Sequence, residues 1–370
     1  MELLARAKAL QALGHDVIHL EVGEPDFETP PPIVQAGIDA LRTGATKYTD
    51  AGGIPELRQA ISRYYADQHD VQVSPSRIFV TAGASGGLLL LTALLLNERE
   101  NLLMTDPGYP CNRHFLSAFN AEGLLVPVTE EDNYQLNPSL VDQFWNEHTR
   151  GVLIATPANP TGSVLTRMEL GDLSKSVQAK NGLLIVDEIY QGLVYENQLR
   201  CTALGVDDNA FIVNSFSKYF GMTGWRLGWV VVPHAYEKDL EKLAQNLFIC
   251  PSTIAQTAAL SAFSDDAIAV MEQQRTEFAN RRNFLVPKLR AIGFDVPQMP
   301  AGAFYVYAKL PSSIDSETFC RRLLEKEYVA ITPGTDFGFH SAEQFVRISY
   351  ARNIEQLNEA VLRIERHLNQ

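Results

Sequence analysis

Residues 211–228 read FIVNSFSKYFGMTGWRLG, and this stretch decides which fold the chain adopts. Its apolar start, Phe211 to Val213, predicts a buried strand, and polar residues follow at once. In open α/β sheets, ligands bind beyond the carboxyl ends of the strands. Because aromatic residues surround Lys218 in the sequence, burial would lower the pKa of its amine and make it a nucleophile toward an aldehyde.

Other groups in the same stretch suit an anion. Arg226 stands eight residues after Lys218 and can pair a phosphate through two hydrogen bonds, with the hydroxyl groups of Ser215 and Ser217 as further donors. The bland alternative is a surface lysine and a structural arginine, and for a lone lysine it is the better explanation. In this stretch the structural alternative would have to explain Lys218, Arg226 and the two serines together.

A short apolar run, a turn and a helix-like stretch recur from about residue 78. The runs are apolar on both faces and comprise Ile78 to Thr81, Leu102 to Thr105, Val152 to Ala155, Leu183 to Val186, Phe211 to Val213 and Trp229 to Val232. This rhythm predicts an α/β fold in which a mainly parallel sheet is covered by helices on both sides. The apolar stretch Leu88 to Leu96 is too short to span a membrane and is expected to be a buried helix.

The pattern changes after about residue 265. A long helix-like segment is followed by two predicted strands, Phe304 to Leu310 and Gln344 to Tyr350, and by a closing helix with one apolar face. We therefore expect a large domain at residues 30–270 and a smaller α+β domain built from both termini, residues 1–29 and 271–370.

The run Leu183 to Val186 is followed by Asp187 and, three residues later, by Tyr190. A carboxylate at the end of a buried strand is costly unless it faces a cation, and a pyridinium nitrogen is such a cation. The Tyr190 hydroxyl could then bond a phenolic oxygen on the same ring. For these two residues taken alone, a helix-start Asp with a packed Tyr is the better explanation.

A glycine-rich turn, Ala82 to Gly87, follows the first run and opens the apolar helix. Free backbone N–H groups and the positive end of the helix dipole make such a turn an anion site, which would include Ala84 and Ser85. The same residues, Gly83-Ala84-Ser85-Gly86-Gly87, also match the G-x-S-x-G elbow of serine hydrolases, with His340 as a conceivable base. That alternative leaves Lys218 and Asp187 without a function.

Four further residues are candidates, each with a structural alternative. Asn159 lies in a Pro- and Gly-rich loop after one run, and Tyr109 follows another, where its ring could lie against a cofactor or simply pack. Arg347 alternates with apolar neighbours in a predicted strand and could bind a carboxylate or lie on the surface. Gly23, in the turn Gly23-Glu24-Pro25-Asp26-Phe27, allows a ligand to approach the backbone closely.

Composition excludes several classes of protein. The formal net charge of -13 and the lack of a dense Lys/Arg run argue against nucleic-acid and membrane partners. Four scattered cysteines, with no C-x-x-C spacing, indicate neither a disulfide framework nor a metal site. With no basic leader after Met1, the cytoplasm is the expected location.

Together these motifs resemble the class I/II aminotransferases, which are fold-type-I pyridoxal-phosphate enzymes, and the likeness covers essentially the whole chain. The stretch Ser215 to Gly228 is similar to the lysine signature of that family. The resemblance implies that Lys218 holds pyridoxal 5'-phosphate as a Schiff base and shuttles protons. It also implies Asp187 on the pyridine nitrogen, Tyr190 and Asn159 on the phenolic oxygen, and Tyr109 stacked on the ring.

The same resemblance implies how phosphate and substrate are held. The expected phosphate-binding residues are Ala84, Ser85, Ser215 and Arg226, and the substrate α-carboxylate would be held by Gly23 and Arg347, near Asn159. A Tyr in the segment Lys47-Tyr48-Thr49 reaches the phosphate of the neighbouring subunit in the family, so Tyr48 implies a homodimer. We identify no arginine for a second, side-chain carboxylate.

The expected activity is transfer of an amino group from an L-amino acid to a 2-oxo acid by a ping-pong mechanism. A pyridoxal-phosphate-dependent C–S β-lyase is an alternative, because both reactions begin with loss of the same α-proton. A regulatory binder that kept the fold is a third hypothesis, and the intact Lys218, Asp187 and Tyr190 argue against it.

Overall fold

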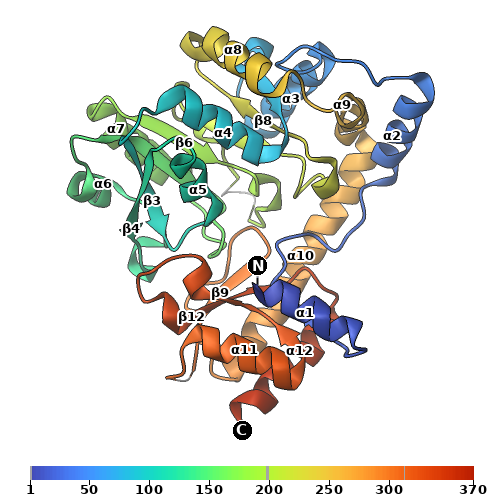
Figure 1. Cartoon of the computed structure of the whole chain (residues 1–370), viewed down its shortest axis with the longest axis vertical. Helices are drawn as coiled ribbons and strands as arrows, with labels where there is room; N and C mark the ends of the chain where they lie inside the picture. Colours follow the sequence, from blue (N-terminus) through green and yellow to red (C-terminus); the bar gives the residue numbers. More distant parts are fainter. Residues whose placement is uncertain (1, 197–199, 312) are drawn as a thin grey trace.

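A seven-stranded sheet forms the centre of the computed structural model, which describes residues 2–196, 200–311 and 313–370 (Figure 1). In spatial order its strands are β2 (Ile78–Thr81), β8 (Gly228–Val231), β7 (Phe211–Ser215), β6 (Leu183–Asp187), β5 (Thr149–Ala155), β3 (Asn101–Asp106) and β4 (Glu122–Pro127). All neighbouring pairs are parallel except those of β8, which runs antiparallel to both β2 and β7. The prediction of an α/β fold with a mainly parallel sheet is confirmed.

Two details of the sheet differ from the sequence-based expectation. The run Trp229 to Val232 fitted a parallel rhythm, but β8 is antiparallel, since the connection from β7 contains no α-helix that could carry the chain back across the sheet. Strand β4 was not predicted at all. It is an edge strand whose residues are mostly only half-buried, and its short apolar run, Leu124 to Val126, lies between Glu122-Gly123 and Pro127.

Helices cover both faces of this sheet. Successive strand residues alternate between two hydrophobic clusters: Val152 and Ile154 belong to one, and Leu153 between them belongs to the other. The helices of this part of the chain are α2 (Pro31–Thr43), α3 (Pro55–His69), α4 (Gly83–Leu95), α5 (Cys111–Ser117), α6 (Pro138–Phe144), α7 (Arg167–Ala179), α8 (Glu237–Phe248) and α9 (Thr253–Leu260). Helix α4 contains most of the apolar stretch at residues 88–96, and the prediction of a buried helix there is confirmed.

The C-terminal part contains a separate three-stranded antiparallel sheet in the order β11 (Thr332–Pro333), β12 (Phe345–Ser349), β9 (Tyr305–Lys309). Its helices are α10 (Asp265–Ala291), α11 (Ser316–Glu327) and α12 (Ile354–Leu368). Figure 1 shows α10 running from beside α2 and α9 down to α12, so it joins the two parts of the molecule. The expected boundary at residue 270 falls inside α10, and the division into domains stays a prediction.

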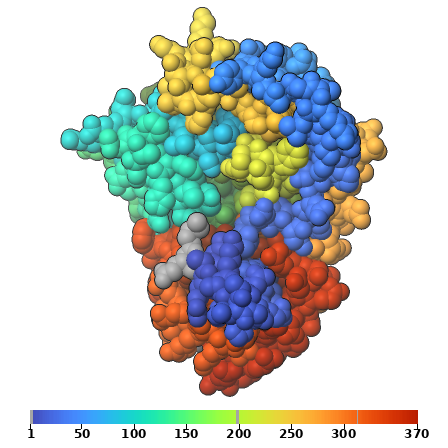
Figure 2. Space-filling view, turned by 45° about the vertical axis from the view of Figure 1, so that its right-hand side comes forward, coloured from blue at the N-terminus to red at the C-terminus, as the bar shows by residue number. Residues whose placement is uncertain are grey.

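The N-terminal segment packs against this C-terminal part. Strand β1 (Ile18–His19) pairs in parallel with β10 (Val329–Ala330), and α1 (Glu2–Ala12) buries Ala7 and Leu10 against Leu324. Figure 2 shows α1 in dark blue, lying over the orange and red C-terminal residues. Within the described ranges, no helix is both long and apolar enough to cross a membrane.

Candidate active site

The carboxyl ends of the parallel strands open onto a cavity of about 370 Å³. Twelve residues that the sequence singled out line it: Gly23, Ala84, Ser85, Tyr109, Asn159, Asp187, Tyr190, Ser215, Ser217, Lys218, Arg226 and Arg347. They come from segments more than 300 residues apart in the chain. One cavity therefore gathers the candidates from the large sheet together with Gly23 and Arg347 from outside it.

Lys218 follows β7 and lies half-buried in the wall of this cavity. Its Nζ atom donates a hydrogen bond to the carbonyl oxygen of Gly23 at 2.6 Å and lies 5.7 Å from the ring centre of Tyr190. Burial lowers the pKa of the Lys218 amine to about 8, and the positive charge of Arg347 acts in the same direction. The amine is thus neutral over a larger part of the physiological pH range than an ordinary lysine.

Asp187 is the last residue of β6 and is buried. Its Oδ1 atom accepts a hydrogen bond from the backbone N–H of Ile189 at 3.1 Å, and no described cationic side chain forms an ion pair with it. Burial raises the pKa of the Asp187 carboxyl to about 6, although the Ile189 N–H and the charge of Lys218 oppose the shift. The site contains a buried acid whose charged form is poorly compensated by the protein.

The glycine-rich turn and Arg226 form a concave polar surface. Gly83 begins α4 with a φ of +71°, and a Cβ atom placed there would lie 2.7 Å from Nη2 of Arg226. On the same wall the Ser215 hydroxyl donates to the Ser217 hydroxyl at 2.9 Å. The absence of a side chain at Gly83 lets the guanidinium approach the start of the helix, where backbone N–H groups are free.

Arg347 reaches the cavity from β12 of the smaller sheet. Its Nη1 donates to Oδ1 of Asn159 at 3.0 Å and its Nη2 to the carbonyl oxygen of Glu21 at 2.6 Å. The rings of Tyr305 and Phe337 lie on the guanidinium, with centres 4.4 and 4.7 Å from its carbon. Nε of Arg347 is buried without a hydrogen-bond partner in the described part of the chain, so a donor is left for an acceptor from outside it.

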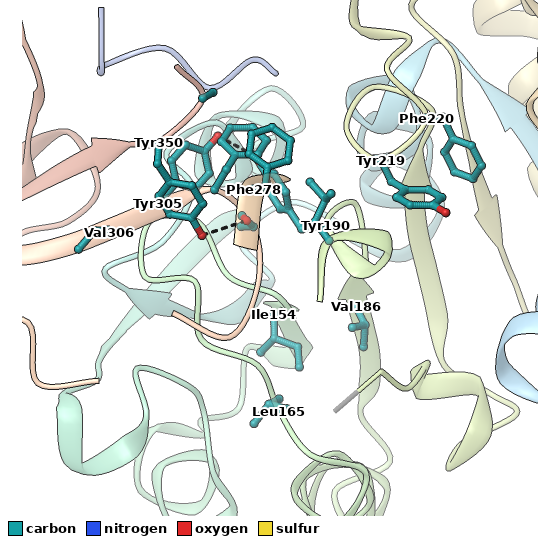
Figure 3. Close-up of a cluster of buried hydrophobic side chains, with 14 of the residues drawn as sticks. Ile154, Leu165, Val186, Tyr190, Tyr219, Phe220, Phe278, Tyr305, Val306 and Tyr350 are labelled. Atoms are coloured by element: carbon teal, nitrogen blue, oxygen red, sulfur yellow. Dashed lines mark hydrogen bonds between the residues drawn. The ribbon is translucent and has the colours of Figure 1, made fainter. Parts of the chain in front are cut away.

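Tyr305 is a cavity residue that the sequence reasoning missed. Its hydroxyl shares a 2.8 Å hydrogen bond with the hydroxyl of Tyr190, drawn as a dashed line in Figure 3. A Cβ atom at Gly23 would lie 2.7 Å from the same Tyr305 hydroxyl. Tyr305 was predicted only as part of a strand, because nothing local in the sequence reports a contact with Tyr190, 115 residues away.

Further lining residues were also missed. They are Leu88, Phe115, Ala155, Ile189 and Thr223. Four of them are apolar, and an apolar residue that lines a cavity has no sequence signal that separates it from one in the core.

Two predicted features lie apart from the cavity wall. Tyr48 is not among its lining residues and its side chain is 81% exposed. His340, the conceivable hydrolase base, is exposed and lines another hollow, and no described histidine hydrogen-bonds to Ser85. The serine-hydrolase alternative therefore has no support from the geometry.

Comparisons with known proteins agree on one family. The family model described as aminotransferase class I and II matches residues 15–364. Valine–pyruvate aminotransferase of Mycobacterium tuberculosis is 39% identical over 98% of this chain and 94% of its own length. Aspartate aminotransferase of Pyrococcus horikoshii is 34% identical, over 99% and 93% respectively.

Solved structures lead to the same family. A crystal structure of an aminotransferase from Mycobacterium tuberculosis covers 100% of this chain and 96% of its own, with a TM-score of 0.96 and 38% identity. Aspartate aminotransferase from Thermus thermophilus with maleate covers 99% of this chain and 95% of its own, with a TM-score of 0.93 and 32% identity. The chain belongs to the class I and II aminotransferases of fold type I, and it is an enzyme that transfers amino groups.

Proposed function

We propose that the enzyme moves the amino group of an L-amino acid to a 2-oxo acid in two half-reactions, with pyridoxal 5'-phosphate bound on Lys218. The observation that carries this proposal is the pairing of Lys218 and Asp187 in one cavity. Asp187 is buried and Lys218 half-buried. Among the described residues, Lys218 is bonded to a neutral carbonyl and Asp187 has no cationic partner. A cofactor with an aldehyde and a basic ring nitrogen supplies what each side chain lacks.

The environment of Asp187 fits the pyridine nitrogen of the cofactor. An uncompensated buried carboxylate costs several kcal/mol, on the order of the effective ionic desolvation penalty, and a protonated ring nitrogen beside it would offset that cost. Tyr190 and Asn159 are assigned to the phenolic oxygen, because both end in groups that can donate a hydrogen bond and both line the cavity. Tyr109, 39% exposed at the cavity, is assigned to the face of the ring.

The phosphate is assigned to the start of α4 and to Arg226. The helix dipole, the free N–H groups near Ala84 and Ser85, and the guanidinium all favour a dianion at this point. Hydroxyl groups of Ser215 and Ser217 line the same cavity and can donate further hydrogen bonds. Gly83 supports the assignment, since any side chain there would collide with Arg226.

The substrate carboxylate is assigned to Arg347. Its unpartnered Nε and its position between two aromatic rings leave it fixed and still able to donate. Asn159 and the backbone at Gly23 lie on the same wall and would complete the carboxylate site.

When bound, pyridoxal phosphate supplies a carbonyl carbon for the amino group and a protonated ring that withdraws electrons from the α-carbon. Once the amino group of the substrate has displaced it from the cofactor, the free Lys218 amine would take the proton from the α-carbon of the substrate and would return it at the C4′ position of the cofactor. Its lowered pKa suits this work, because the amine must be neutral to accept the proton. Arg347 holds the carboxylate so that the Cα–H bond is presented to Lys218.

A homodimer is part of the proposal. Tyr48 is 81% exposed and lies next to Lys47, whose carbonyl accepts a hydrogen bond from Thr253 at 2.6 Å. Apolar side chains are also exposed on α2 and at the end of α8: Val34, Ile38, Leu41, Leu247, Phe248 and Ile249. A second copy covering these residues would bury them and could bring Tyr48 to the neighbouring phosphate.

Amino acids with uncharged side chains are the proposed donors. Of the described residues, the cationic ones lining the cavity are Lys218, Arg226 and Arg347, and the proposal already uses all three. A second carboxylate would be buried without a partner, which is costly. The relatives include both valine–pyruvate and aspartate aminotransferases, so donor choice needs a direct test.

The test is a donor screen on purified enzyme incubated with pyridoxal phosphate. We expect a visible absorbance band of the bound cofactor, which valine or alanine removes and pyruvate restores, whereas aspartate acts much more slowly. Absence of the band in the wild-type protein would refute the proposal. Release of pyruvate from a cysteine conjugate without any 2-oxo acid would instead identify a C–S β-lyase.

A further inference from the structure

The segment between β1 and α2, residues 20–30, contributes Gly23 to the cavity wall and contacts Lys218 there. Its residue Gly23 accepts the hydrogen bond from Nζ of Lys218 at 2.6 Å. The Gly23 backbone is tightly packed here, because a Cβ atom on Gly23 would lie 2.7 Å from the Tyr305 hydroxyl. The position of one backbone carbonyl therefore determines where the Lys218 amine rests.

The far end of this segment is bound to the loop that carries Lys218. The Thr29 hydroxyl donates to the carbonyl oxygen of Gly221 at 2.6 Å, and Nε1 of Trp225 donates to the Thr29 hydroxyl at 3.2 Å. The segment is thus fixed to the lysine loop on the α2 side.

The middle of the segment is held by α10. Nη1 of Arg281 donates to Oδ1 of Asp26 at 2.7 Å, and the Arg281 side chain is only 5% exposed. Its guanidinium also lies 4.7 Å from the ring centre of Phe27, and Nε donates to Glu277 at 3.0 Å. The Asp26 side chain is 20% exposed, so this charge-assisted bond is part-buried, and on a rigid helix it fixes a loop better than a fully exposed ion pair does.

We propose that Arg281 is a positioning residue for catalysis, which acts through Asp26 to fix the Gly23 carbonyl that orients the Lys218 amine. The inference rests on the proposed function of Lys218. Arg281 does not line the cavity, so it is placed to act through other residues and not by direct contact with the reacting groups. Because only Glu24 and Pro25 separate Asp26 from Gly23, release of the Asp26 carboxylate transmits directly to the Gly23 backbone.

Arg282 provides a matched control on the next position of the same helix. It is similarly buried, bonds the Glu196 carboxylate at 3.1 Å and the Pro300 carbonyl at 2.7 Å, and lies 4.7 Å from the ring centre of Tyr195. Its partners hold a different loop. Substitution of Arg282 therefore removes a similar set of buried contacts but leaves the Arg281–Asp26 bond in place.

The experiment measures the first half-reaction in the holoenzyme as a single turnover, followed by the absorbance of the bound cofactor at saturating amino donor. We expect Asp26→Asn and Arg281→Lys each to slow it about 10-fold, as misplaced catalytic groups do. The double variant should be no slower than the worse single variant, because both remove one interaction. Arg282→Lys should keep the wild-type rate.

A second measurement is independent of turnover. Hydrogen exchange of backbone amides in residues 20–30 should accelerate in Asp26→Asn and Arg281→Lys, and not in Arg282→Lys. If both variants keep the wild-type rate, with or without a lower thermal midpoint or faster exchange, Arg281 is merely structural and the inference is wrong. A wild-type enzyme without the half-reaction would refute the proposed function instead, so the two failures are distinguishable.

Discussion

The guanidinium of Arg347 donates a 3.0 Å hydrogen bond to the side-chain oxygen of Asn159, although 188 positions separate the two residues. Asn159 follows β5 of the seven-stranded sheet, and Arg347 belongs to β12 of the smaller sheet. The proposed carboxylate site therefore exists only when both sheets are in place.

Replacing Arg347 with Lys should weaken substrate binding. A lysine keeps the charge but cannot donate in the fixed, planar arrangement of a guanidinium, so we expect KM for the amino donor to rise roughly 10- to 100-fold. Steady-state kinetics measure the change, with Arg352→Lys outside the cavity as the control. An unaltered KM would contradict the assignment, provided that the absorbance of the bound cofactor is normal.

Lys218→Ala should be unable to form the visible absorbance band of the bound cofactor. In the wild type, protein freed of cofactor should capture pyridoxal phosphate faster as pH rises through about 8, because burial lowers the Lys218 pKa and only the neutral amine attacks. Stopped-flow absorbance at a series of pH values gives the midpoint. A midpoint at the ordinary lysine value would show that Lys218 is not desolvated.

Asp187→Asn should stabilise the cofactor-free protein while impairing catalysis. Burial raises the Asp187 pKa to about 6, so the folded state is penalised wherever this carboxyl is ionised. We expect a gain in the free energy of unfolding of about 3 kcal/mol above pH 6, which shrinks as pH falls from about 6 to about 4. Urea unfolding at pH 8 and at about pH 4 measures this gain in the free energy of unfolding. A loss of stability at pH 8 would contradict the argument.

Tyr48→Phe should weaken cofactor affinity about 10-fold by removing one hydrogen bond to a charged phosphate. The dimer proposal makes a sharper prediction for a hybrid of one Tyr48→Phe chain and one Lys218→Ala chain. If Tyr48 acts on the partner's site, one site is fully intact and half of the wild-type activity remains. If it acts within its own chain, the only site with a lysine carries the Tyr48→Phe defect.

Local signals explain why most of the site was predictable. Asp187 directly follows a run of apolar residues, and Lys218 and Ser85 follow their own runs within about five residues. The carboxyl ends of parallel strands meet at one edge of a sheet. A strand that is apolar on both faces is easily recognised in the sequence, and so are the polar residues that follow it. The edge strand β4 and the antiparallel direction of β8 were not predicted, because hydrophobicity alone shows neither an edge position nor a strand direction.

The amino-acid sequence predicted six of the seven strands of the central sheet, the chemical nature of the strand ends and, through the lysine stretch at residues 215–228, a specific family resemblance. Three contacts became visible only in the folded chain: Lys218 donates to Gly23, Tyr305 shares a hydrogen bond with Tyr190, and Arg281 donates to Asp26. The physical reason is that hydrophobic periodicity and turn chemistry act over a few neighbouring residues. Contacts across hundreds of positions depend instead on how distant segments of the chain, here the residue 20–30 segment, α10 and the two sheets, pack against one another.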